Sequence, residues 1–283
     1  VGGGSSLSDV ANIVVDAEAP TVTGVTSPSP DGTYTAGETV TILVQMSEDV
    51  LVTGSPTLEL PPGATGPAVL SGPAEGTPSD VLTFTYTVQE GDDFTDLDYD
   101  SANALTLGPG DSIADSSGND ADVTLAEPGT PGSLADSANI NVDAKAPSVT
   151  SVGVTGTTAE GTYSTGTELV IVVELDEAVK VTGSPTLQLD VGQASPALAT
   201  LSSPTSADAA TTLLTSKYTV QAGDSTADLA YPSTTSLLVG SGTIRDESGN
   251  DADVTLPAPG SAGSLSGQNA IKIDTQSASV AAV

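Results

Sequence analysis

The sequence DGTYTAGETVTILV at residues 31–44 returns, slightly altered, as EGTYSTGTELVIVV at residues 160–173. Each copy places a Gly-containing turn before a run of alternating or continuous apolar residues, which is typical of a β-strand. The neighbouring segments repeat in the same order, at a period of roughly 130 residues. VTGSPTLEL from Val52 returns as VTGSPTLQL, YTVQEGD from Tyr86 returns as YTVQAGD, and SGNDADVTL from Ser117 returns unchanged. The chain therefore contains one fold twice.

Within each copy, the apolar runs are short and are separated by clusters of Gly, Pro, Ser and Asp. Such clusters mark turns, and β-branched Val and Thr favour strands over helices. No segment has helical periodicity, so we expect no helix. About seven short strands in about 130 residues indicate a sandwich of two antiparallel sheets. The predicted fold is therefore all-β, with two tandem antiparallel β-sandwiches and surplus terminal strands.

The ends of the repeats define the predicted domains. Residues 6–20 match residues 133–147 without a gap, so the chain opens with a last strand that has no domain of its own in front. DTQSASVAAV from Asp274 matches the opening strand of a repeat. We therefore predict an N-terminal surplus strand at 1–16, repeat 1 at 17–143, repeat 2 at 144–274, and a C-terminal strand at 275–283 that begins a further repeat or forms a subunit contact.

Three explanations fit the surplus strands. The chain is an excerpt of a longer repeat array, or its N-terminal strand completes a neighbouring subunit by β-strand addition, or both ends are flexible tails. The alternating apolar residues Ile13 and Val15 argue against simple tails.

Composition excludes several function classes. The chain has no Cys and no His, which removes disulfides, thiol chemistry and His-dependent catalysis. It has 37 acidic and 5 basic residues, a net charge of −32, which would repel nucleic acid and anionic lipid. No apolar run is long enough to span a membrane. A glycosidase would use paired carboxylates and usually aromatic platforms, and Trp is absent. We expect no enzyme and no catalytic residue.

Three repeated motifs carry a resemblance to a known family. They are the DxxAP joint at residues 16–20, the YTVQxGD…DLxY segment at 86–99 and the DxSGNDADxTL segment at 115–125, each with its second copy. Together they resemble the tandem bacterial immunoglobulin-like and cadherin-like repeats of large surface adhesins and extracellular filament proteins. The resemblance implies immunoglobulin-like sandwiches, a location outside the cell or on its surface, and calcium bound at or near domain junctions.

The repeated acids are the candidate metal ligands. A sandwich topology puts the turn that contains Glu48 or Glu177, and the loop before the last strand, beside the joint that precedes each domain. We expect Asp143 to gather Asp92 and Asp96 from the first domain with acids from the second. Ca²⁺ takes six to eight oxygen ligands in a tolerant geometry, whereas Mg²⁺ demands a stricter octahedron. The predicted ligands are Asp16, Glu48, Asp92, Asp96, Asp115, Asn119, Asp120, Asp122, Asp143, Glu177, Asp224, Asp228, Asp246, Asn250, Asp251, Asp253 and Asp274. The alternative is that these acids only solvate the loops.

We therefore predict a structural subunit of an extracellular filament or surface fibre, assembled end to end by β-strand addition and stiffened by calcium at domain junctions. Its partners would be identical subunits head to tail, or the flanking repeats of the same chain. The alternative is a passive spacer segment of a giant cell-surface adhesin, and a third reading is a carbohydrate-binding or enzymatic module. Charge alone does not separate calcium dependence from adaptation to salt, because both predict an acidic surface.

Overall fold

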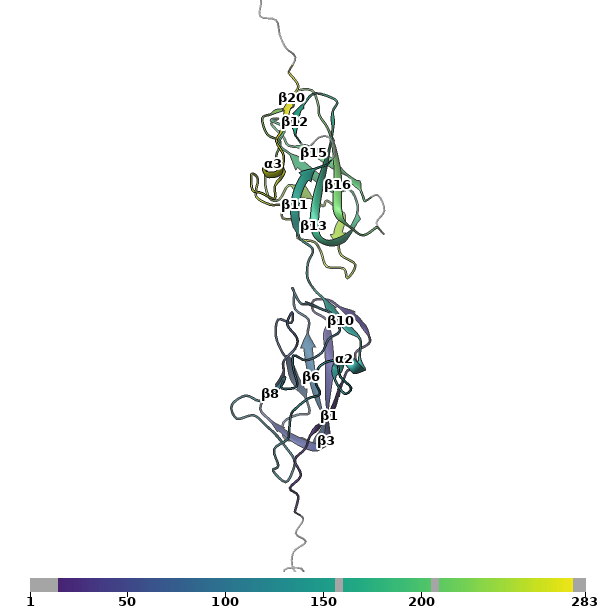
Figure 1. Cartoon of the computed structure of the whole chain (residues 1–283), viewed down its shortest axis with the longest axis vertical. Coiled ribbons are helices and arrows are strands. Elements are labelled where there is room, and N and C mark those ends of the chain that lie inside the picture. The colour runs from purple at the N-terminus through teal and green to yellow at the C-terminus, as the bar shows by residue number, and fades with distance from the viewer. Residues whose placement is uncertain (1–14, 156–159, 205–208, 277–283) are drawn as a thin grey trace, which may run out of the picture. The chain divides into compact units, whose positions relative to one another are not determined.

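The structure is a computed structural model that describes residues 15–155, 160–204 and 209–276. The chain divides into two compact units, Val1–Ala144 and Lys145–Val283, here called unit 1 and unit 2 (Figure 1). The predicted terminal strands lie outside the described residues, apart from residues 15, 16, 275 and 276. They stay predictions.

Unit 1 consists of two sheets that face each other. The larger sheet has the order β1-β3-β6-β5-β4-β8, with β9 paired to β3, and the smaller has the order β2-β10-β7. The elements are β1 Val22–Thr26, β2 Gly32–Tyr34, β3 Thr39–Thr53, β4 Thr57–Leu58, β5 Ala68–Gly72, β6 Ser79–Thr87, β7 Asp93–Phe94, β8 Leu105–Thr106, β9 Ser112–Ala114, α2 Leu134–Ser137 and β10 Ile140–Asp143.

Unit 2 repeats this arrangement element for element. Its larger sheet has the order β11-β13-β16-β15-β14-β18, with β19 paired to β13, and its smaller sheet has the order β12-β20-β17. The elements are β11 Val149–Val154, β12 Gly161–Tyr163, β13 Glu168–Thr182, β14 Thr186–Leu189, β15 Ala197–Ser203, β16 Thr211–Thr219, β17 Ser225–Thr226, β18 Leu237–Leu238, β19 Thr243–Arg245, α3 Leu265–Gln268 and β20 Ile271–Asp274. The all-β fold with two sandwiches is thus confirmed.

The central strand of each unit shows why the sequence folds this way. In the first half of β3, from Thr39 to Met46, every second residue points into the core, and Val40, Ile42 and Val44 are completely buried. Leu82 and Phe84 of the paired strand β6 are buried in the same cluster. Alternation along two paired strands gives one apolar face and one solvated face, as a sandwich requires.

One pairing in each smaller sheet differs from the antiparallel prediction. The last strand, β10, runs parallel to β2, with Ile140 opposite Gly32 and Val142 opposite Tyr34. In unit 2, β20 runs parallel to β12 in the same register. The opening segment of each unit thus contributes one strand to each sheet, and its second strand lies beside the last strand of the domain.

The expectation of no helix is wrong in one detail per unit. α2 and α3 each have four residues, too few to give a helical period in the sequence. Each begins at a serine whose hydroxyl accepts a backbone hydrogen bond: Ser133 from Asp136 at 3.3 Å and Ser264 from Gly267 at 3.1 Å. This is ordinary N-capping, and a Ser before Leu is its only signal in the sequence.

A bulge interrupts β3 and positions one of the candidate ligands. Gln45 pairs with Val81 and Val50 with Ser79, so four residues of β3 face one residue of β6. Glu48 lies in this extra segment, inside a continuous strand and not in the turn that we expected. Glu177 lies in the equivalent bulge of β13, between Glu174 and Val179. A bulge redirects a side chain that a regular strand would hold in the pleat.

Candidate metal centre

Three carboxylates converge in unit 1. One carboxylate oxygen each of Asp16, Glu48 and Asp115 lies within 4.8 Å of the others. Asp16 belongs to the segment that leads into β1, Glu48 to the bulge of β3, and Asp115 follows β9. The cluster therefore joins three segments that are far apart in the sequence. An all-oxygen set of this kind is the donor set that Ca²⁺ prefers.

Asp115 is held by its own loop. Its Oδ1 accepts hydrogen bonds from the backbone N–H groups of Ser117 and Asn119, both at 2.8 Å, and its Oδ2 accepts one from Nδ2 of Asn119 at 2.7 Å. The side chain is only 5% exposed. The bonds from Asn119, first from its side chain and then from its backbone, hold the pKa of Asp115 below its usual value. Asp115 is therefore a fixed anion.

Asp16 contacts the same loop. Its Oδ2 lies 3.4 Å from the donating hydroxyl of Ser117, and its backbone oxygen lies 3.4 Å from Nδ2 of Asn119. Both bonds are long, and Asp16 is exposed. These contacts thus attach Asp16 itself weakly to the loop, whereas Pro20, four residues later, accepts a backbone hydrogen bond from Asp122 at 2.8 Å.

Glu48 experiences the charge of its neighbours. Partial burial raises its pKa, and the negative charges of Asp16, Asp115 and Glu18 raise it further. Lys and Arg occur only at positions 145, 180, 217, 245 and 272, so unit 1 contains no basic side chain. The charges of this cluster are therefore uncompensated by any cationic residue of the unit.

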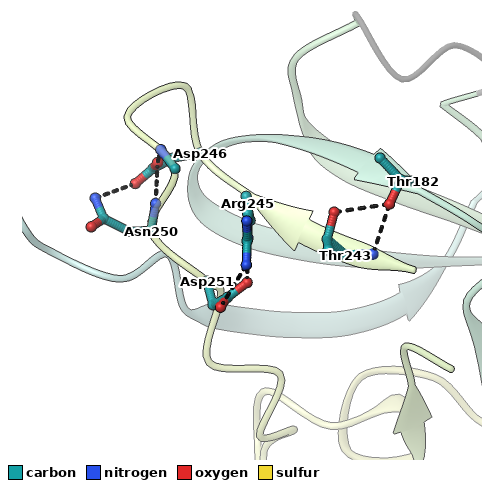
Figure 2. A network of polar contacts seen from close by, with 7 residues as sticks. Thr182, Thr243, Arg245, Asp246, Asn250 and Asp251 are labelled. Atoms are coloured by element: carbon teal, nitrogen blue, oxygen red, sulfur yellow. Dashed lines mark hydrogen bonds and ion pairs between the residues drawn. The ribbon is translucent and has the colours of Figure 1, made fainter. Parts of the chain in front are cut away.

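Unit 2 builds the same loop with a different charge balance (Figure 2). Oδ1 of Asp246 accepts from the backbone N–H groups of Gly249 at 2.6 Å and Asn250 at 2.9 Å, and its Oδ2 accepts from Nδ2 of Asn250 at 2.8 Å. Arg245 forms a two-point ion pair with Asp251, at 2.5 and 3.1 Å. Ala114 and Asp120 occupy these last two positions in unit 1. Asp251, a predicted ligand, is thus paired with an arginine.

A lysine also replaces one acid within the DxxAP joint of the second repeat. The first repeat reads DAEAP and the second DAKAP, so Lys145 stands where Glu18 stands. Nζ of Lys145 lies 3.4 Å from Asp176 and 4.0 Å from Glu177. The prediction of equivalent joints did not include this difference, although the change from Glu18 to Lys145 is visible in the repeat.

Two other predicted ligands are used elsewhere. Asp92 and Asp224 are buried, at 0% and 3% exposure, and each accepts hydrogen bonds from a tyrosine hydroxyl and a backbone N–H group. They lie in the turn that follows β6 or β16, which is at the opposite end of these strands from the bulge. We therefore leave them out of the proposed metal ligands.

The other predicted ligands lie in the strands and loops of the two units. Asp122 and Asp253 each accept a backbone hydrogen bond from the threonine two residues later, at 3.0 and 2.9 Å. Asp96 has a φ of 55° and Asp228 is exposed. Asp143 ends β10 opposite Asp93, and Asp274 ends β20 opposite Ser225. Asp120 is exposed beside Ala114.

Comparisons with known proteins add little. No protein-family model and no curated protein matches the chain. Among solved structures, a marsupial T cell receptor is similar over 90% of this chain and 74% of the receptor chain, with 12% identity and a TM-score of 0.30. That likeness carries no argument about function. No helix among the described residues is long and apolar enough to cross a membrane. The sheets of the chain itself show two all-β sandwiches.

Proposed function

We propose that the chain is a structural segment of an extracellular filament or surface fibre, in which calcium fastens the segment leading into a repeat. The observation that carries this proposal is the convergence of Asp16, Glu48 and Asp115 within 4.8 Å in a unit without basic residues. A divalent cation would remove the repulsion between these carboxylates. It would also link the leading segment to the bulge and to the 115–122 loop, which are parts of the folded domain.

Calcium suits this cluster for physical reasons. The ligands are hard oxygens from an exposed, a half-buried and a buried carboxylate, so the geometry can adjust and water can complete the shell. A cation that binds only the folded arrangement stabilises it by mass action. Pro20 is already fixed by a backbone hydrogen bond from Asp122, but Asp16 is held to the domain by two long hydrogen bonds, so a cation there would make residues 16–19 bend less freely. The expected product is a stiffer chain of repeats.

The first test is thermal unfolding of the full chain with calcium and with a chelator at one ionic strength. Calcium at about 100 times its Kd should add about 2.7 kcal/mol of stability to unit 1. Glu48→Gln and Asp115→Asn should each abolish most of this gain. Glu90→Gln removes the same charge from an exposed residue at the other end of β6, and it should keep the gain. Equal calcium responses in all four proteins would overturn the calcium proposal.

The second test concerns assembly. We propose that residues 9–16 pair with a neighbouring copy or repeat by strand addition. Deleting residues 1–14 removes that strand but keeps Asp16, so the shortened chain should lose assembly and still be stabilised by calcium. Electron microscopy and sedimentation measure the first effect, and thermal unfolding the second. Particles that persist after the deletion would contradict strand addition.

The alternative is a spacer within a longer surface adhesin. It is favoured by the match of DTQSASVAAV at the C-terminus to the start of a further repeat. A purified chain that remains monomeric with and without calcium, yet is stabilised by calcium, would support the spacer over the filament subunit.

A further inference from the structure

The surface of unit 1 has a hollow beside β5 and β6. Its volume is about 370 Å³, and a second hollow of about 600 Å³ adjoins it, sharing Thr65, Thr87 and Gln89. Both volumes fall in the range of small-molecule sites, about 300–1,000 Å³. The first hollow is lined chiefly by Thr65, Pro67, Val69, Thr85, Thr87 and Gln89.

The lining has a distinctive chemistry for a chain with a net charge of −32. The first hollow presents threonine hydroxyls and a glutamine amide, beside the apolar surfaces of Pro67 and Val69, and has no charged side chain in its lining. Val69 lies on the solvated face of the sheet and is 54% exposed. Hydroxyls and amides donate and accept hydrogen bonds without charge.

A buried carboxylate fixes this lining from below. Oδ1 of Asp92 accepts from the backbone N–H of Thr65 at 2.8 Å and also from its hydroxyl. Its Oδ2 accepts from the backbone N–H of Gln89 at 2.6 Å and from the hydroxyl of Tyr86, whose ring forms part of the lining. Asp92 is completely buried. One side chain thus holds three lining residues in place, which is the preorganisation that binding sites need.

Unit 2 keeps the support and changes the lining. Asp224 accepts from Tyr218 at 2.5 Å and from the backbone of Gln221 at 2.7 Å, as Asp92 does from Tyr86 and Gln89. Lys217, however, occupies the position of Thr85, and its Nζ lies 2.9 Å from Glu168. An ion pair therefore lies on the sheet face where unit 1 has neutral hydroxyls. The equivalent face of unit 2 therefore serves as an internal control for the hollow of unit 1.

The geometry restricts the ligand. An extended peptide cannot add a strand here, because β5 and β6 are both paired on each side within the larger sheet. An anion would be repelled by the acidic chain, and the first hollow offers no charged ligand to a cation. The remaining fit is a neutral ligand with many hydroxyls and an apolar face.

We propose that this hollow binds a neutral glycan. Thr85 donates its hydroxyl to Ser71 and Gln89 donates its amide to the carbonyl of Thr87, so the side-chain oxygens of both residues would accept hydrogen bonds from sugar hydroxyls, as would the hydroxyl of Thr87. Pro67 and Val69 would pack against the C–H face of a sugar ring. This binding goes beyond the structural role and does not depend on calcium. It would let a fibre segment hold a polysaccharide along its length.

The test uses the full chain, labelled for NMR and titrated with cellohexaose, maltohexaose and mannohexaose. At least one should produce saturable shifts in the amides of residues 65–69 and 85–89. Thr85→Val and Thr87→Val keep the shape and β-branching of the side chain while removing its hydroxyl, and each should weaken binding by about three- to ten-fold. Thr219→Val, the equivalent of Thr87 in unit 2, is the matched control and should leave the Kd unchanged.

Two further probes separate this proposal from the calcium site. Glu48→Gln should lose the calcium response and keep glycan binding. The acidic hexagalacturonate should not compete. The proposal is overturned by the absence of saturable shifts with all three neutral hexasaccharides, by valine variants that bind as tightly as the parent, or by preferred binding of hexagalacturonate.

Discussion

The phenolic hydroxyl of Tyr218 donates a hydrogen bond to Oδ2 of Asp224 at 2.5 Å, and Tyr86 makes the same bond to Asp92. This pair explains why YTVQxGD is repeated. In each copy the aspartate also accepts from the backbone N–H three residues earlier and so closes the turn after the strand. Burial of the ring is the main cause that raises the pKa of each tyrosine, and the hydrogen bond to the adjacent carboxylate raises this pKa further.

Replacing these aspartates should destabilise the two units unequally. Asp92→Asn should cost about 3 kcal/mol, since bonds to a charged acceptor contribute about 1.5–3 kcal/mol and a buried amide would leave donors unpaired. Asp224→Asn should reduce stability by less, because Asp92 accepts two additional hydrogen bonds, both from Thr65. Urea unfolding measures both. The exposed Asp93→Asn is the control and should change stability by less than about 0.5 kcal/mol.

Acid should destabilise unit 1 through Asp92 and Asp115. Burial opposes ionisation of Asp92, but hydrogen bonds from Thr65, Tyr86 and Gln89 outweigh it and lower its pKa. The folded state then binds fewer protons than the unfolded state, in which an aspartate has a pKa of about 3.9. The stability gained is present above that value and lost as the pH falls through the folded pKa. Unfolding midpoints between pH 6 and pH 2 measure this loss, which should shrink in Asp92→Asn.

Glu48 should show the opposite dependence. Its raised pKa means that the folded state retains a proton at pH values where the unfolded state has lost it. Stability is therefore lost as the pH rises through the folded pKa. In calcium-free buffer at pH 7, Glu48→Gln should be more stable than the parent, and in calcium it should lose that advantage. A variant less stable than the parent under both conditions would contradict the repulsion between Glu48 and its acidic neighbours.

Glu18→Lys should give unit 1 the charge pattern of the second repeat. The new cation would remove one of the charges that raise the pKa of Glu48 and would compete with calcium for the cluster. We expect a small gain in stability without calcium, within the 0–1 kcal/mol of exposed ion pairs, and a weaker calcium affinity. Calorimetric titration measures the affinity. Glu18→Gln separates loss of the negative charge from gain of the positive one, and its affinity should fall between those of the parent and the lysine variant.

The sequence was sufficient for the fold class because its repeats and alternation are strong. Val40, Ile42 and Val44 follow a simple period of two, and this period predicts a buried strand face. It did not place Glu48, because a bulge depends on pairing with β6 and leaves no periodic signal. It also did not separate Asp92 from the exposed acids, because a tyrosine six residues earlier does not by itself indicate burial, and Thr65, which also bonds Asp92, lies 27 residues away.

The parallel pairing of β2 with β10 has a mechanical consequence. A pull on the chain at both ends of unit 1 first loads β1, which is paired with β3, and reaches the start of β2 and the end of β10 once β1 has detached. In a parallel pair these two points lie at opposite ends of the paired strands. The load therefore acts in shear on all the hydrogen bonds of the pair at once. In an antiparallel pair, the same pull would break the interstrand hydrogen bonds one after another. β12 and β20 give unit 2 the same protection. Each domain is thereby built to resist tension along its own chain.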